Sequence, residues 1–303
     1  MKISVLVTQM LILFLMIGCG WLSGKEKLLK EEIIPDFSRI VLNIGIPGVV
    51  LSSATGGSRF TVSEVLLYLL GFFLFSVLCA LMAKAVVWIT GIKTDRRLYE
   101  FMYMFSNVGF MGLPVVEAVL GKEALIYAVL FLLPNNLMLF SYGEYLMRDK
   151  KGISLKKLGN PPVIASMLAI VICLLHLQLP PVLEKALTSM GNITTPMAML
   201  IIGASLSQAK IREMLEDYRI YVFLAIKMLI LPILYWLILS RLPIPEEVVV
   251  MMILMMAMPV PSNTVIYAGL YQKNIKLACE ASVLTSLVCV ITIPLVFAVI
   301  SLF

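Results

Sequence analysis

Apolar runs of membrane length recur along nearly the whole chain, separated by short polar or charged segments. The hydrocarbon core of a bilayer is about 30 Å thick, so a helix needs about 20 apolar residues to cross it. The runs predict ten spans, at residues 5–22, 34–53, 64–90, 98–120, 124–147, 161–179, 182–206, 220–240, 246–271 and 277–303. Because a segment in lipid must satisfy its own backbone hydrogen bonds, we expect an all-α membrane protein.

The fourth span contains a polar, helix-breaking stretch at residues 105–121, FSNVGFMGLPVVEAVLG. Asn107, Gly109, Gly112 and Pro114 lie close together in it. Proline has no backbone N–H and its ring clashes with the carbonyl four residues earlier, so we expect the helix to break near Pro114. Such a break is tolerated in a membrane only where the freed groups are buried in protein or line a watery cavity.

The ninth span carries a second interruption at residues 256–264, MAMPVPSNT, with Pro259, Pro261, Ser262 and Asn263. Two interrupted helices in corresponding places are a sequence signal for the binding site of a transporter. The alternative is that the prolines only kink the two helices for packing. We predict two broken helices, in spans four and nine, that cross at a binding site.

The two halves of the chain resemble each other. The sequence NIGIP at residues 43–47 has a counterpart, NITTP at 192–196, about 150 residues later, and the two broken spans are separated by nearly the same distance. Five spans in each half is an odd number, so the second half must enter the membrane from the opposite side. The expected organisation is an inverted repeat, with five helices in residues 1–147, a linker at 148–160 and five helices in 161–303.

Composition agrees with a membrane protein, because 61% of the residues are hydrophobic, 14% are charged and the mean hydropathy is +1.00. Lys and Arg in the loops after odd-numbered spans outnumber those in the other loops by about three to one, and the basic side of a membrane protein faces the cytoplasm. We expect a multi-pass protein of the plasma (inner) membrane with both termini outside. The net charge of +6 therefore reports topology, not nucleic-acid binding.

No catalytic or metal-ligating motif is present in the sequence. The five cysteines lie in apolar spans without metal-ligand spacing, and no His/Asp/Glu cluster or nucleotide-binding motif occurs. We therefore expect neither an enzyme nor a bound metal or cofactor.

The interrupted helices suggest an anion site. A helix that restarts near the midplane presents unpaired N–H groups and a partial positive charge, which favour a carboxylate. Asn107 and Asn263 would add neutral hydrogen bonds. Asn136, beside Asn135 in the middle of span five, is polar enough to line the same cavity, although bonding between helices is an equal alternative.

Lys227 stands eight residues inside span eight, about 12 Å from its end. At that depth a charged residue is expected to be functional. Three roles remain open: a counter-charge for the substrate, a proton carrier, or a partner for the carbonyls of a broken helix. Glu144 and Glu280, near span ends, are expected at the membrane interface.

These features together resemble the auxin efflux carrier family. The resemblance rests on the ten-span plan, the stretch 105–114 with its trailing Gly121, the span holding Lys227 and Pro232, and the segment 258–263. The family comprises plant auxin exporters and bacterial permeases, some of them tied to malate. The long cytoplasmic loop of the plant exporters is missing, which favours the bacterial, malate-permease-like branch.

The resemblance implies a fold related to bile-acid sodium symporters, with two crossed, broken helices carried by an elevator-like domain against a dimerising scaffold. Asn107 and Pro114 match the first crossover, and Pro259 with Asn263 match the second, where Pro261 is an additional proline. The expected function is a secondary carrier of a small organic anion, with a homodimer as the assembly. The alternatives are a sodium-coupled organic-anion symporter and a non-transporting membrane sensor.

Overall fold

The computed structural model describes residues 3–55, 61–148, 159–175, 177–208, 214, 218–261 and 263–301. Within these ranges the regular structure is entirely helical. Seven helices are long and apolar enough to cross a membrane. The all-α membrane class is therefore confirmed, whereas most of the predicted linker 148–160 and Ser262 lie outside the described residues.

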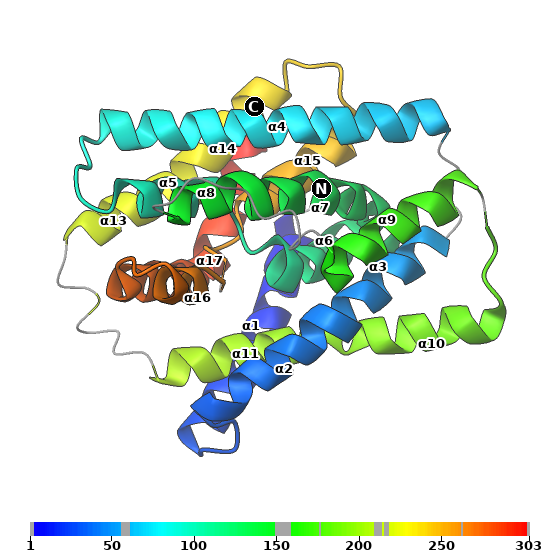
Figure 1. Cartoon of the computed structure of the whole chain (residues 1–303), viewed down its shortest axis with the longest axis horizontal. Coiled ribbons are helices and arrows are strands. Elements are labelled where there is room, and N and C mark those ends of the chain that lie inside the picture. Colours follow the sequence, from blue (N-terminus) through cyan, green and yellow to red (C-terminus); the bar gives the residue numbers. More distant parts are fainter. Residues whose placement is uncertain are drawn as a thin grey trace.

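Figure 1 shows the arrangement of the helices. Those of the first half are α1 (Ile3–Lys25), α2 (Ile34–Ile40), α3 (Ile46–Thr55), α4 (Val62–Ile89), α5 (Arg96–Met104), α6 (Leu113–Leu120), α7 (Leu125–Met138) and α8 (Glu144–Met147). Those of the second half are α9 (Pro161–Leu174), α10 (Pro181–Asn192), α11 (Thr194–Gln208), α13 (Tyr218–Ala225), α14 (Leu231–Leu239), α15 (Glu246–Met256), α16 (Asn263–Leu270) and α17 (Ile275–Ile300).

The seven long helices correspond to predicted spans two to five, seven, eight and ten. The first predicted span corresponds to α1, and the sixth contains the shorter apolar helix α9. The ninth predicted span consists of α15 and α16, which are separated by a non-helical segment. The inverted arrangement of ten spans stays a prediction.

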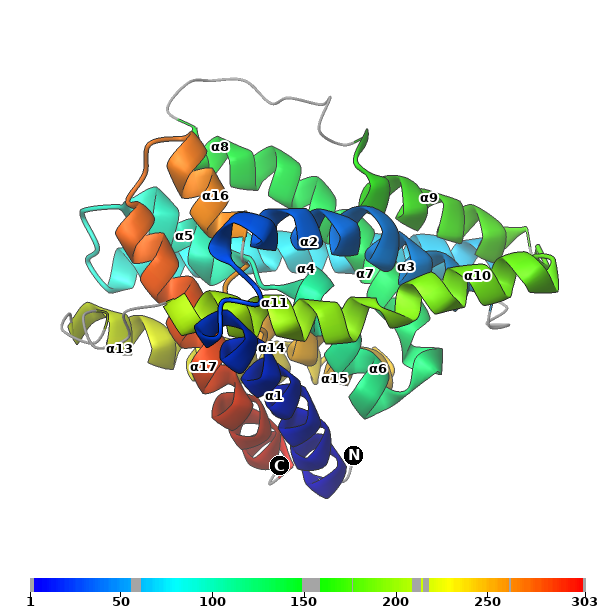
Figure 2. The same cartoon turned by 90° about the horizontal axis from the view of Figure 1, so that it is seen from below.

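The helices pack in two groups. The panel group consists of α1, α2–α3, α9 and α10–α11, in which α1 packs along α11 and α3 packs against both α9 and α10. The crossing group contains the remaining helices, in which α4 packs on α5 and α7, and α17 packs on α14 and α16. Figure 2 shows α2–α3 and α10–α11 of the panel group running side by side across the molecule.

Glycines allow the closest helix contact of the panel group. Gly20 of α1 faces the backbone of Leu200, and Gly203 of α11 faces the backbone of α1. A Cβ atom on Gly203 would lie 2.0 Å from the carbonyl oxygen of Ile17. In lipid, helices associate through such close packing of small residues because hydrophobic burial gives no driving force there.

Three prolines are accommodated by π-helical turns. Each turn ends two residues before its proline: η2 (Val41–Gly45) before Pro47, η3 (Val108–Gly112) before Pro114, and η7 (Ile226–Ile230) before Pro232. Proline clashes with the carbonyl four residues earlier, and a local change to i→i+5 bonding redirects the backbone groups that this clash displaces. From the sequence, Asn43 and Pro47 are expected to interrupt the second predicted span; this expectation is wrong, because the helix continues through both residues.

Gly203→Ala should destabilise the protein by about 1–3 kcal/mol, because the added methyl group forces α1 away from α11. Thermal unfolding of the purified protein in detergent measures this effect. Gly18→Ala is the matched control, since a Cβ atom at Gly18 meets nothing within 4 Å. The control should leave the melting temperature unchanged or raise it, and equal melting of the two variants would contradict the packing argument.

Candidate functional site

The first break lies upstream of the proline that was expected to cause it. Helix α5 ends at Met104, residues 105–107 are non-helical, and the chain resumes as η3 at Val108. Pro114 lies further along, at the start of α6 and directly after the π turn. The predicted break near Pro114 is thus corrected to Phe105–Asn107, because the π turn lets the restarted helix accept the proline.

The second break is where the sequence placed it. Helix α15 ends at Met256 and α16 begins at Asn263, so the segment between them is interrupted. Pro259 and Pro261 both lie in this gap. Two consecutive X-Pro pairs prevent regular helical bonding across the segment.

The two breaks are joined to each other by hydrogen bonds. The Asn107 N–H donates to the Pro259 carbonyl at 2.7 Å, and the Ser106 hydroxyl donates to the Met256 carbonyl at 3.1 Å. On the far side, the Val260 N–H donates to Oγ1 of Thr285 in α17 at 3.0 Å. These bonds satisfy backbone groups that the interruptions expose inside the membrane.

Lys227 is buried at this crossing, with 2% of its surface exposed. Its ammonium group donates to the carbonyls of Tyr103 at 3.1 Å and Phe105 at 3.0 Å, and to the Ser106 hydroxyl at 2.8 Å. Of the roles considered from the sequence, the structure therefore shows that of a partner for the carbonyls of a broken helix, here at the end of α5.

A cavity of about 280 Å³ lies beside the crossing, between the panel and crossing groups. The panel group contributes residues of α2–α3 and the start of α9, while the crossing group contributes the first break, α7 and Pro261. The polar residues lining it are dominated by amides: Asn43, Asn107, Asn135, Asn136 and Asn160. Gly109 and Ser106 also line it.

Asn107 provides an unused hydrogen-bond donor at this cavity. The residue is 5% exposed, and within the described part of the chain its Nδ2 atom has no hydrogen-bond partner. Gly109 and Phe110 lie in the first turn of the restarted helix and also line the cavity. First-turn N–H groups have no intrahelical acceptor, so they too are available to a ligand.

The other predicted site residues have different places. Gly112 packs against α15, where a Cβ atom would lie 2.5 Å from Met255 Sδ. Pro114 is buried and is not among the residues lining the cavity. Pro259 accepts the Asn107 N–H. The backbone of Asn263 begins α16, but the position of its side chain lies outside the described structure.

Sequence reasoning missed three residues of this region. Asn43 was considered as part of a repeated motif and as an interruption of span two, and Asn160 as the end of the linker, but neither as a site residue, yet both line the cavity. Thr285 orients the second break from α17. Only Asn43 had a usable signal, since an asparagine in the middle of an apolar span is unusual.

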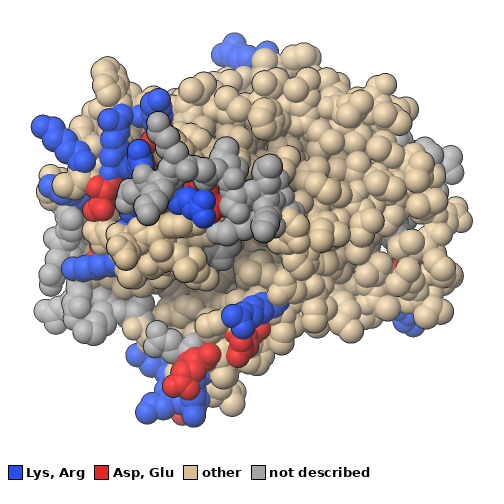
Figure 3. All heavy atoms as spheres, viewed as in Figure 1, with Lys and Arg blue, Asp and Glu red and all other residues tan. Residues whose placement is uncertain are grey.

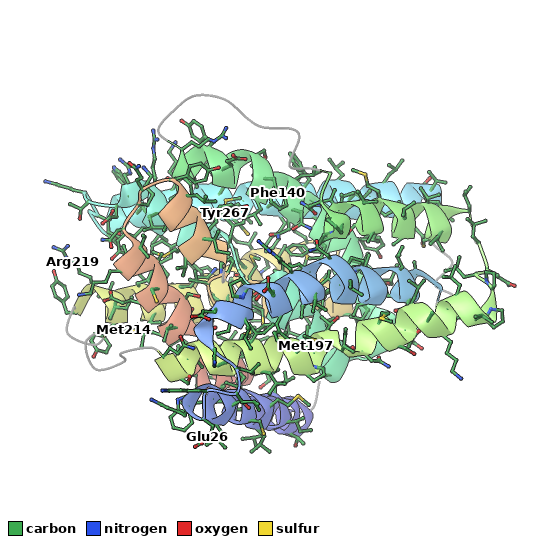
Figure 4. The ribbon with its side chains drawn as sticks, turned by 60° about the horizontal axis from the view of Figure 1, so that its bottom comes forward. Glu26, Phe140, Met197, Met214, Arg219 and Tyr267 are labelled. Atoms are coloured by element: carbon green, nitrogen blue, oxygen red, sulfur yellow. The ribbon has the colours of Figure 1, made fainter. Side chains whose placement is uncertain are left out.

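A polar cluster ties α16 to α5 and α8 at one end of the crossing group. The Tyr271 hydroxyl donates to Glu144 Oε1 at 2.6 Å, and Arg148 Nε lies 3.0 Å from the same oxygen. Tyr267, labelled in Figure 4, packs edge-on against Phe101 of α5. Glu144 lies near a helix end as expected, but protein covers it to 1% exposure instead of leaving it at an open interface. Glu280 is likewise buried.

A second cavity, of about 200 Å³, is acidic. Its lining includes Glu117, Glu123 and Glu184, together with Ser52 and Thr188. Three carboxyl groups disfavour a bound anion, whereas amides and open N–H groups favour one. The cavity at the crossing is therefore the better candidate for the site expected from the sequence.

Comparison with known proteins shows the family of the chain. The model of the family "Membrane transport protein" matches residues 5–156 and again 150–297. The chain belongs to this family. It is the auxin efflux carrier family that the sequence resembles.

Relatives of the family carry the name transporter. An uncharacterized transporter of Methanocaldococcus jannaschii is 27% identical over 211 residues, covering 65% of this chain and 68% of that protein. The uncharacterized transporter YfdV of Escherichia coli K12 is 22% identical over 302 residues, covering 91% of both. An uncharacterized transporter of Methanothermobacter thermautotrophicus is 23% identical over 223 residues, covering 70% of both. The chain is a membrane transporter by family.

Thr285→Val should destabilise the crossing by about 1–3 kcal/mol, because it leaves the buried N–H of Val260 without an acceptor. Thr292→Val, on the same helix, is the matched control: Thr292 Oγ1 is buried without a partner among the described residues, so its removal breaks no bond. Melting curves in detergent should separate the two variants. If Thr285→Val melts like the control, the hydrogen bond to Val260 does not hold the second break.

Proposed function

We propose that this chain is a secondary carrier of a small organic anion, a carboxylate, which binds in the asparagine-lined cavity at the crossing. The observation that carries the proposal is the buried Nδ2 atom of Asn107, which has no hydrogen-bond partner among the described residues and lies beside the first turn of the restarted helix. An oxyanion placed there would accept hydrogen bonds from Asn107 and from the N–H groups of Gly109 and Phe110. The partial positive charge of the helix start adds to this preference.

The composition of the cavity fits an anion that must also be released. Its described lining includes amides and apolar side chains but no Lys or Arg side chain. Amide donors lose less hydration free energy than a fixed charge and hold the substrate less tightly. Leu42, Ile46, Leu132 and Phe140 provide apolar surface for the organic part of the substrate.

The position of the cavity supports an elevator-like mechanism. Its walls belong to the panel group on one side and to the crossing group on the other. If the crossing group moved along the panel group, its half of the cavity would move with it. Other residues of the panel group would then replace Asn43 and Asn160 in the lining. Alternating access in transporters with broken helices is largely a rigid-body movement of this kind.

Helix contacts support the proposed inverted repeat. In the panel group, α1 packs on α11 as α9 packs on α3. In the crossing group, α5 packs on α4 as α15 packs on α14. Each contact joins elements that correspond under the repeat of residues 1–147 and 161–303. The family model also matches the two halves of the chain separately.

The charge distribution supports the proposed orientation. Figure 3 shows Lys and Arg gathered over the side where α5, α13 and α16 have their ends. The chain ends lie together at one end of the molecule, where α1 packs along α17 (Figure 2). We assign the basic side to the cytoplasm and both termini to the outside of the plasma membrane. A homodimer follows from the family resemblance alone.

Purified protein in liposomes should take up a labelled carboxylate that matches the cavity. A panel of mono- and dicarboxylates, each with and without proton and sodium gradients, identifies the substrate and separates a free or proton-coupled carrier from a sodium-coupled symporter. Methyl esters and amides of the best substrate should not compete with it, because they lack the charge that the helix start selects. Equal competition by acid and ester would contradict an anion site.

Asn107→Ala should weaken binding of that carboxylate by about 1–2 kcal/mol, or about 5- to 30-fold, the effect of one lost hydrogen bond. Binding measured by ligand-induced stabilisation or isothermal calorimetry gives the change directly. Asn192→Ala is the control, since Asn192 lines the acidic cavity and not the cavity at the crossing. A larger loss in the control than in Asn107→Ala would assign the substrate to the other cavity.

A further inference from the structure

The ammonium group of Lys227 is completely coordinated by oxygen. It has three N–H donors, and the structure provides three acceptors at 2.8–3.1 Å: the carbonyls of Tyr103 and Phe105, and the hydroxyl of Ser106. All three belong to the end of α5 and the break that follows it. The donors and acceptors of this site are therefore matched in number.

The neutralisation of this buried charge comes from the backbone. Within the described residues no ion pair includes Lys227. A buried cation without a carboxylate is unfavourable unless other groups compensate it. Here the compensation comes from the carbonyl end of α5, which carries a partial negative charge.

The same oxygen set is typical of a site for a dissolved cation. Small hard cations are bound by carbonyl and hydroxyl oxygens. In ion-coupled carriers the coupling cation is coordinated by unwound backbone carbonyls and by the C-terminal ends of half-helices. The end of α5 offers both features, but a side chain of the protein itself occupies the position.

Lys227 also reaches the second break. Ser106 accepts from the ammonium group and donates to the carbonyl of Met256, the last residue of α15. The corresponding helix of the other half, α4, places Cys79 beside Met256, with Sγ 3.5 Å from Sδ. A thiol stands there in place of an ammonium group, so Lys227 coordinates the carbonyl end of α5 directly and is linked to the end of α15 through Ser106.

We propose that Lys227 is a tethered cation, which fills the cation site of the crossing permanently and makes sodium or any other dissolved inorganic cation unnecessary for this carrier. The part concerning transport rests on the proposed function, whereas the occupied cation site does not. Removing the side chain should leave an empty site of two carbonyls and a hydroxyl. Ser106 lines the cavity, so a small cation from solution can reach that site.

The test compares Lys227→Ala with Lys227→Met in detergent, in ammonium chloride, sodium chloride or N-methylglucamine chloride at equal ionic strength. Lys227→Ala should melt below the wild type, and ammonium or sodium should raise its melting temperature saturably by about 2–4 °C over N-methylglucamine, which is too large to enter. Lys227→Met should show no such gain, because its thioether fills the space. The wild type and Lys84→Ala, an exposed lysine on α4, should melt equally in all three salts.

Two results would overturn the proposal: a Lys227→Ala protein that folds but gains no stability from either small cation, or a wild type stabilised by sodium over N-methylglucamine. If Lys227→Ala cannot be purified, the wild-type comparison decides alone, with equal melting in all salts supporting the tethered cation. In liposomes, wild-type uptake should be unchanged when sodium is replaced by N-methylglucamine. Failure to find any transported anion would refute the proposed function but leave the melting result intact.

Discussion

Three hydrogen bonds from one buried ammonium group hold the centre of this structure together. Where α5 stops, its last carbonyls point into protein inside the membrane, and no water is present to satisfy them. Lys227 satisfies the carbonyls of Tyr103 and Phe105 and orients Ser106, which in turn holds the end of α15. The direct bond from Asn107 to Pro259 then fixes the distance between the two breaks. Each broken helix is thus stabilised by groups from other helices.

The prolines have a different role from the one that the sequence suggested. A proline in an apolar span indicates an interruption, yet Pro47, Pro114 and Pro232 all lie in continuous helical stretches behind a π turn. The breaks occur where the chain offers replacement hydrogen bonds: at Ser106 and Asn107, and at the segment facing Thr285. A break in lipid is therefore decided by the available partners as much as by the residue that disfavours the helix.

The need for such partners explains which parts of the fold and of the candidate site could be predicted from the sequence. Apolar runs fixed the helical class and most of the spans, since burial in lipid acts on composition alone. The second break was correctly placed because it holds two prolines in one short segment. The first was misplaced by several residues, because its position depends on Lys227, which is distant in sequence. Asn43 and Asn160 could not be assigned to the cavity for the same reason: only the packing of α2–α3 and α9 against the crossing group brings them to Asn107.

The two helix ends that flank the first break carry opposite partial charges. The carbonyl end, at Tyr103 and Phe105, binds Lys227, while Gly109 and Phe110, in the first turn of the restarted helix, line the cavity. Under the proposed function, the break would hold Lys227 and the substrate anion within a few residues of each other without a direct ion pair between them. The fixed ammonium keeps the carbonyl end satisfied whether or not the cavity is filled. Under the proposed function, the carbonyl end of the break would stay satisfied while the crossing moves with its cavity empty, and no dissolved cation would be needed for that step.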